Sequence, residues 1–114
     1  MAISIKTHKM LWGRSGNICA FPECNKALVV DETSTDDPSI IGEEAHIVAQ
    51  SIDGPRGNSI LSVEQRDKYD NLILLCSVHH KIVDDQEREY TVEKLRQFKL
   101  DREKKSSSQQ ITDI

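Results

Sequence analysis

The chain is poor in aromatic residues, with two Phe, two Tyr and one Trp among 114 positions. Hydrophobic residues make up 37% of the sequence and charged residues 30%. A chain of this length forms one domain at most, and so thin a core needs a disulfide or a metal ion to stabilise it. We therefore expect a single, cross-linked domain.

The sequence also lacks the features of an exported or membrane protein. Three cysteines cannot all form disulfides with one another. The first ten residues have no apolar signal-peptide core, and no apolar run approaches the roughly 20 residues that span a bilayer. These absences favour a zinc ion over a disulfide as the cross-link. They also predict a cytoplasmic location and no membrane partner.

A surplus of positive charge is missing too, since the net charge is −4. Taken alone, this value argues against nucleic-acid binding, but the charges are unevenly distributed. Seven acids and one lysine lie between Glu23 and Glu44, whereas residues 88–105 carry seven bases and four acids. The second segment is either a basic strip that follows phosphates or an ordinary solvated helix.

Short periodic segments between polar loops predict an α+β domain. We expect a helix over residues 7–12, strands over 27–30, 44–48 and 72–75, a helix capped by Ser77 and a last helix capped by Thr91. The serine- and glutamine-rich residues 106–114 are expected to be a disordered tail, so the ordered domain spans residues 1–105.

The cysteines and one histidine have the spacing of a structural zinc site. Cys19 and Cys24 form a C-x4-C pair, and Cys76 and His79 form a C-x2-H pair. Two short pairs of soft ligands that the fold brings together are typical of tetrahedral zinc. The alternative is that the cysteines are small buried apolar residues.

Two of the three histidines that this zinc site leaves free, His46 and His80, lie in segments with an expected structure. His79 and His80 are adjacent, so on a helix their side chains point about 100° apart and can face two different sites. His46 lies in a strand-like segment, and Asn71 opens the apolar strand that leads to Cys76. A hairpin followed by a helix would bring His46, Asn71 and His80 together.

The order of these segments resembles the HNH endonuclease family. The matching stretches are Cys19 to Cys24, Glu44-Ala45-His46-Ile47, Asn71-Leu72 and Cys76-Ser77-Val78-His79-His80, within residues 7–105. The resemblance implies a zinc-stabilised ββα-metal fold with flanking helices that hydrolyses DNA with a divalent ion. It also implies that His46 is the general base, that His80 is a metal ligand and that Asn71 orders the loop around them.

A hard ion such as Mg²⁺ needs oxygen ligands besides His80, and we expect Glu44 to supply one. Ala45 stands where many family members carry an aspartate ligand, which weakens this assignment. Asp84, one turn after His80, is either a hydrogen-bond partner of that imidazole or a solvent-facing acid. Arg56 is either a phosphate contact or an ordinary loop arginine.

The resulting expectation is a metal-dependent nuclease that contacts the DNA backbone with low sequence specificity. Similar modules precede sensing domains in bacterial anti-phage effectors, so a regulatory partner is implied, and a dimer is one way to cut both strands. The first rival is a zinc-knuckle binding module with an inactive site, favoured by Ala45 and by the negative net charge. A thiol or acyl-transfer enzyme that uses Cys76 is a second, weaker rival.

Overall fold

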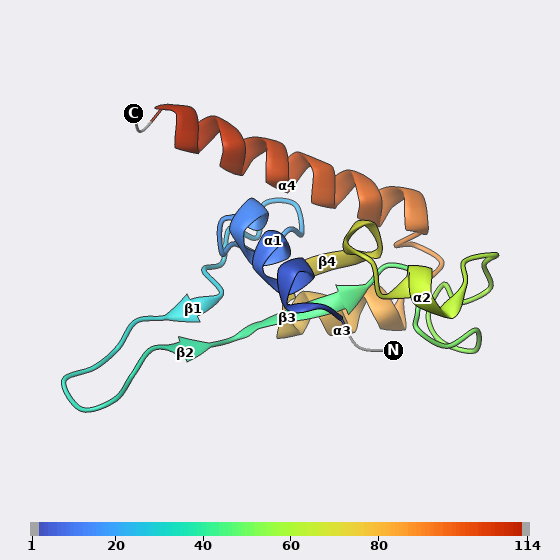
Figure 1. The fold of residues 1–114 in the computed structure, drawn as a ribbon, viewed down its shortest axis with the longest axis horizontal. Coiled ribbons are helices and arrows are strands. Elements are labelled where there is room, and N and C mark those ends of the chain that lie inside the picture. Colours follow the sequence, from blue (N-terminus) through green and yellow to red (C-terminus); the bar gives the residue numbers. More distant parts are fainter. Residues whose placement is uncertain (1–2, 113–114) are drawn as a thin grey trace.

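The structure, a computed structural model, describes residues 3–112, and the side chains of residues 3–108 (Figure 1). Short strands are interspersed with helices along the chain. In order, the elements are α1 (Ile5–Ser15), β1 (Val29–Val30), β2 (Ser39–Ile40), β3 (Gly42–His46), α2 (Val63–Arg66), the 3₁₀ helix η1 (Tyr69–Asn71), β4 (Leu72–Cys76), α3 (Ser77–Asp85) and α4 (Val92–Thr112). Mixed helices and two small two-stranded sheets agree with the α+β expectation.

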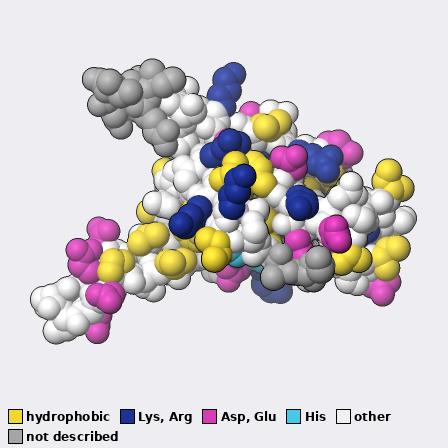
Figure 2. Space-filling model, viewed as in Figure 1, with side chains coloured by type: hydrophobic (Ala, Val, Ile, Leu, Met, Phe, Trp, Pro, Cys, Tyr) yellow, Lys and Arg dark blue, Asp and Glu magenta, His cyan; other side chains and the backbone are white. Residues whose placement is uncertain are grey.

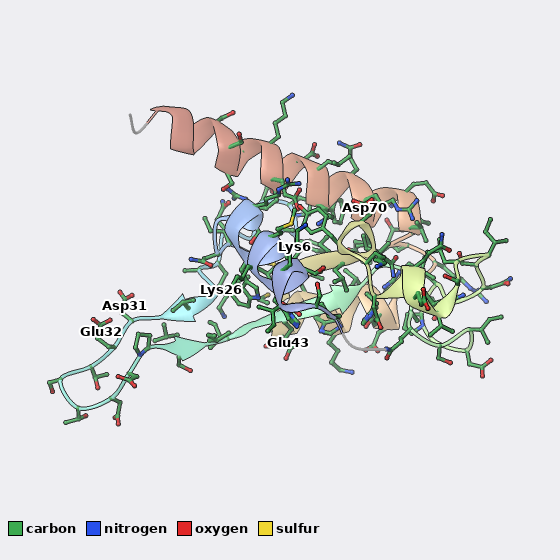
Figure 3. The ribbon with its side chains drawn as sticks, in the orientation of Figure 1. Lys6, Lys26, Asp31, Glu32, Glu43 and Asp70 are labelled. Atoms are coloured by element: carbon green, nitrogen blue, oxygen red, sulfur yellow. The ribbon has the colours of Figure 1, made fainter. Side chains whose placement is uncertain are left out.

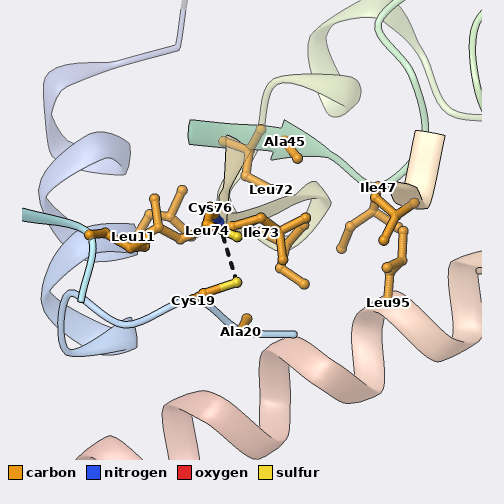
Figure 4. Close-up of a cluster of buried hydrophobic side chains, with 13 residues drawn as sticks. Leu11, Cys19, Ala20, Ala45, Ile47, Leu72, Ile73, Leu74, Cys76 and Leu95 are labelled. Carbon is orange, nitrogen blue, oxygen red and sulfur yellow. Dashed lines mark hydrogen bonds between the residues drawn. The ribbon is translucent and has the colours of Figure 1, made fainter. Parts of the chain in front are cut away.

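The β3–β4 pair is the centre of the molecule. The strands are antiparallel, with Gly42 opposite Cys76 and His46 opposite Leu72. All five residues of β4 are buried, because α1 and α4 lie on one side of the pair and α3 lies on the other (Figure 1). Burial on both faces explains an unbroken apolar run in place of alternation. The buried side chains continue into α1 and α4 (Figure 4).

Helix α1 is longer at both ends than the expected segment of residues 7–12. Ser4 caps its N-terminus by accepting a hydrogen bond from the amide of Thr7. The helix passes through Gly13 and ends at Gly16, which adopts the left-handed conformation with φ of 69°. Only the second of the two glycines therefore acts as a stop signal.

A compact turn-forming segment, residues 18–27, lies between α1 and β1. The amide of Cys19 bonds to the carbonyl of Lys26, and the amide of Ala20 bonds to the carbonyl of Leu74 on β4. Glu23 and Asn25 have positive φ angles of 65° and 54°. This segment, called the knuckle below, is therefore folded back on itself and attached to the central strand.

Strands β1 and β2 form a two-stranded arm that projects from the body of the molecule (Figure 1). The strand expected over residues 27–30 is shorter in the structure and comprises Val29 and Val30 alone. The second strand of the arm, Ser39–Ile40, was not predicted because a two-residue strand carries no periodic signal.

Helix α3 begins directly where β4 ends. Its N-cap is Cys76, whose sulfur accepts from the amide of His79 at 3.5 Å, and not Ser77 as predicted. The strand continues to Cys76, so Ser77 becomes the first helical residue. This direct connection places Cys76 and His79 within the same turn.

Helix α4 contradicts the expected disorder of residues 106–112, since it continues to Thr112. Its N-terminal cap agrees with the prediction: Thr91 accepts from the amide of Lys94 at 3.3 Å. Ser106 is 4% exposed, and its hydroxyl lies 2.7 Å from where a side chain on Gly16 would begin. Packing against the end of α1 thus orders the helix beyond its apolar part. Residues 113–114 of the expected tail lie outside the described residues.

Candidate metal centre and active site

Three cysteines and one histidine converge where the knuckle meets the start of α3. Their ligand atoms all lie within 4.8 Å of one another. The Nδ1 atom of His79 is 3.2 Å from the sulfur of Cys76 and 3.8 Å from that of Cys19. Cys24, from the same knuckle as Cys19, is the fourth member. The two spaced pairs in the sequence are therefore brought together.

These separations suit a small tetrahedral ion. Zinc–sulfur bonds of about 2.3 Å and zinc–nitrogen bonds of about 2.0 Å give edges of roughly 3.5–3.8 Å in a tetrahedron. The distances from His79 Nδ1 to the two sulfurs lie close to this range. The cluster could therefore hold a metal ion such as zinc through three sulfurs and one nitrogen.

Burial and hydrogen bonds shift the pKa values of the clustered side chains in different directions. Burial raises the pKa of the Cys19 thiol to about 12. Burial also opposes ionisation of Cys76, but hydrogen bonds from the His79 amide and from the neighbouring cysteines outweigh it and lower the pKa of that thiol. Burial, assisted by Lys26, lowers the pKa of His79. A neutral imidazole is the form that binds a metal.

An aromatic cluster covers this Cys₃His cluster. Phe21 of the knuckle stacks on the His79 ring with 4.0 Å between ring centroids and 3° between planes. Tyr90 and Phe98 each lie 5.5 Å from Phe21 at tilted or edge-on angles. The stack fixes the plane of the His79 ring and keeps water from one of its faces. Sequence analysis missed this role because nothing local links Phe21 to His79.

His80 faces a different environment from its neighbour. Its Nδ1 atom lies 2.8 Å from Glu43 on β3, and its Nε2 atom lies 3.2 Å from Asp84 on its own helix. Figure 3 shows Glu43 on β3 beside α3. The hydrogen bond to Asp84, together with the one to Glu43, raises the pKa of His80 although burial opposes this. An imidazole thus lies between two carboxylates in a half-buried site.

Asp84 is held by an arginine and a histidine. Burial disfavours its charge, but hydrogen bonds from His80 and Arg56 outweigh burial and lower the pKa of this carboxyl. The Arg56 contact, from a guanidinium nitrogen to Oδ1, is 2.7 Å long. Asp84 is thereby kept ionised and is directed toward His80.

The side chain of Arg56 is 4% exposed and points into the protein. Its guanidinium donates to the backbone carbonyls of Ile47, Val83 and Tyr90 as well as to Asp84. Its φ of 55° places the backbone in the left-handed region, which this set of bonds maintains. Arg56 therefore joins the loop to α3, and the burial of its side chain favours the alternative of a structural loop arginine over a phosphate contact.

Glu44 lies against α1 and not beside His80. Its carboxylate bonds to Nδ1 of His8 at 2.7 Å and accepts from the indole nitrogen of Trp12 at 3.0 Å. Adjacent residues of a strand point to opposite faces, so Glu43 is the residue that meets α3. Sequence analysis chose the wrong member of the Glu43–Glu44 pair as the neighbour of His80, because alternation alone does not say which face the helix covers.

His46, at the end of β3, has a carboxylate partner that sequence analysis did not identify. Its Nε2 atom lies 2.8 Å from Oδ1 of Asp67, and the two side chains are 22% and 5% exposed. Gln50 donates to both oxygens of Asp67 at 3.4 and 3.2 Å. No local motif marks Asp67, which lies 21 positions after His46.

Asn71 is 2% exposed and connects the two segments that carry this pair. Its amide nitrogen donates to the carbonyls of Val48 and Arg66, and its amide oxygen accepts from the nitrogen of Val48, all within 2.9 Å. The structure therefore gives Asn71 the loop-ordering contacts that the sequence suggested, and it does so through the backbone.

Comparisons with known proteins add no family assignment. No protein-family model matches the chain, and no curated protein shows significant similarity to it. Among the described residues, no helix has the length and apolar character to cross a membrane.

Proposed function

We propose that this protein is a zinc-stabilised HNH nuclease of the ββα-metal type that hydrolyses phosphodiester bonds in DNA. One observation carries the proposal. The antiparallel β3–β4 pair runs directly into α3, with His46 at the end of β3 and His80 on the helix. Each of these histidines is paired with a carboxylate, and neither belongs to the Cys₃His cluster.

In this proposal the Cys₃His cluster holds a structural zinc ion. It joins the knuckle to the first turn of α3 and so compensates for the small core. His46 is the general base that takes a proton from the attacking water, since an imidazole titrates near neutral pH. Asn71 holds the loop that carries His46 through its backbone bonds.

The donors available for a catalytic divalent ion are His80, Glu43 and Asp84. Two carboxylates and one imidazole in a half-exposed site suit Mg²⁺ or Mn²⁺. Both nitrogens of His80 are engaged by the carboxylates, so binding would require one nitrogen to exchange its carboxylate for the ion. When bound, such an ion would offset the negative charge that develops on the phosphate. Glu43 replaces Glu44 in this assignment.

The proposal that DNA is the substrate is supported by the distribution of charge and not by the net charge. On the face drawn in Figure 2, Lys and Arg side chains lie over the body with several acids among them, whereas the projecting arm shows acids. Contacts of this kind recognise the phosphate backbone and give little sequence specificity. A role in defence against phage, next to a sensing domain or partner, remains part of the proposal through the family resemblance alone.

The deciding experiment is cleavage of supercoiled plasmid by the zinc-loaded protein with EDTA, Mg²⁺, Mn²⁺ or Ni²⁺. Metal-dependent cutting that falls by at least about 100-fold in His46→Ala would support the proposal. His8→Ala is the matched control, because His8 is the histidine bonded to Glu44 against α1, and it should cut at the normal rate. A folded, zinc-loaded protein that cuts with none of these ions would overturn the nuclease assignment.

A nucleic-acid-binding module without catalysis is the second candidate. It is favoured by Ala45 directly before His46, where no side chain can ligate an ion, and by the net charge of −4. Binding of the plasmid that is equal in EDTA and in Mg²⁺, with no cutting in either, would select this candidate.

A further inference from the structure

The C-terminal end of α2 holds a buried carboxylate directly against His46. Asp67 is the residue after this helix, its side chain is 5% exposed, and its Oδ1 atom lies 2.8 Å from His46 Nε2. The amide of Gln50 supports the same carboxylate from another direction. A carboxylate of such low exposure needs hydrogen-bond donors, and His46 and Gln50 are the side chains that contact it.

The fold fixes both members of the pair independently of each other. Ser62 and Gln65 form a reciprocal capping box that defines the single turn of α2 before Asp67. The guanidinium of Arg66 is buried and donates to four backbone carbonyls of the preceding loop, those of Ala49, Gly57, Ser59 and Leu61.

The side chain of Asn71 then connects the segments that carry His46 and Asp67, through hydrogen bonds to their backbones. It bonds to Val48, two residues after His46, and to Arg66, one residue before Asp67. The distance between His46 and Asp67 is therefore set by buried contacts on each side and not by the pair alone.

The contact determines which ring nitrogen of His46 carries the proton. An ionised carboxylate only accepts hydrogen bonds, so the nitrogen that faces it must donate. Nε2 is therefore the N–H, and Nδ1 keeps the lone pair that can take a proton. Of the other histidines that contact carboxylates, His8 does so through Nδ1, and His80 contacts one carboxylate through each ring nitrogen. His46 differs from both in contacting its carboxylate through Nε2 alone.

We propose that Asp67 is the positioning residue of the general base: it holds His46 as the Nε2–H tautomer, so that Nδ1 accepts the proton of the attacking water. The water oxygen then bonds to phosphorus, and the water proton resides on Nδ1. The bond from phosphorus to the 3′ oxygen breaks, and the 3′ oxygen keeps the electron pair and takes a proton from solvent water. Asp67 stabilises the resulting imidazolium through Nε2–H. This inference rests on the proposed function and assigns that function a residue outside the family resemblance.

Kinetics of single and double variants test the positioning role. Asp67→Asn should lower kcat for plasmid cleavage on the order of 100-fold with little change in KM, because the amide can present either a donor or an acceptor to Nε2. Asp67→Asn combined with His46→Ala should be no slower than His46→Ala alone. Asp85→Asn, the same change at an exposed acid of α3, should leave kcat unchanged. A double variant that is much slower than His46→Ala, or a loss that appears in KM, would show a merely structural role.

Long-range ¹H–¹⁵N correlation spectra of the zinc-loaded protein test the tautomer without reference to cleavage. At a pH where His46 is neutral, the wild type should show Nε2 protonated and Nδ1 unprotonated, and Asp67→Asn should lose this preference. A neutral His46 protonated on Nδ1 in the wild type would overturn the inference even if the protein cuts DNA. The expected tautomer in a protein that cuts nothing would leave the His46–Asp67 pair intact and would reject the nuclease function alone.

Discussion

At the scale of the residue, side chains that are neighbours in sequence contact different partners. His79 meets three cysteine sulfurs and His80 meets two carboxylates, because adjacent positions on a helix point in different directions. Glu43 and Glu44 are divided in the same way between α3 and α1 by the alternation of a strand. Substitution of one neighbour or the other should therefore affect metal binding and stability differently.

His79→Ala and His80→Ala provide such a matched pair. His79→Ala removes a metal ligand and the ring on which Phe21 stacks, so the protein should lose zinc on dialysis and several kcal/mol of stability, or more than about 10 °C in Tm. His80→Ala removes half-exposed ion pairs, so it should keep zinc and cost about 1 kcal/mol or less. Zinc content by atomic absorption and Tm by circular dichroism give the comparison. Equal zinc retention by the two variants would refute this division.

The side chains that could be predicted from the sequence are those whose partners are set by short spacing. Cys19 with Cys24, and Cys76 with His79, are such pairs, and the Cys₃His cluster agrees with them. The carboxylate partners of the histidines could not be predicted in the same way. Glu43 depends on which face of β3 the helix covers, and Asp67 depends on the folding of a whole loop between it and His46.

At the scale of the element, α4 contains one buried stripe of mixed polarity. Its members Leu95, Lys99, Arg102 and Ser106 recur at intervals of four, three and four residues, and each is 6% exposed or less. Lys99 donates to Glu103 and lies 3.6 Å above the ring of Tyr69. The apolar pattern ends at Phe98, but burial continues through polar side chains. Composition therefore predicted a disordered tail from residue 106, where the buried Ser106 lies against the end of α1 and the helix continues.

Gly13 within α1 and Gly16 at its C-cap test the contact between α1 and α4. Gly16→Ala places a side chain at a φ of 69° and 2.7 Å from the Ser106 hydroxyl, so it should destabilise the protein by roughly 1–3 kcal/mol. Gly13→Ala has nothing within 4 Å and lies inside the helix, so it should stabilise the protein by roughly 0.5–1 kcal/mol. Chemical denaturation with urea measures both values. Changes of the same sign would mean that the described end of α1 is wrong.

At the scale of the whole molecule, charge separates the arm from the helical face. The loop of the arm carries Asp31, Glu32, Asp36 and Asp37. Figure 3 shows Asp31 and Glu32 on the projecting arm and Asp70 on the body of the molecule. The basic side chains of α1 and α4 lie on the body (Figure 2). The negative net charge is thus produced in large part by a projection that is separate from the proposed site. A protein with this net charge can bind a polyanion if the arm points away from the bound polyanion.

Neutralising the arm tests this arrangement under the proposed function. The variant carrying Asp31→Asn, Glu32→Gln, Asp36→Asn and Asp37→Asn removes four negative charges without touching the core, the zinc ligands or His46. Its DNA affinity should increase several-fold at 10 mM salt, where the screening length is about 30 Å, and should approach the wild-type value at 150 mM, where that length is about 8 Å.

The salt dependence distinguishes a distant charge effect from direct contact. Lys104→Gln with Lys105→Gln, on α4, is the matched control and should weaken binding at low salt instead. Fluorescence anisotropy with a labelled duplex measures both variants, and plasmid cleavage at saturating DNA should give an unchanged kcat for the arm variant. An affinity gain that persists at 150 mM salt would mean that the acids of the arm lie within about 8 Å of the bound phosphates. The arm would then be part of the binding surface and would oppose binding there directly, as like charges do at short range.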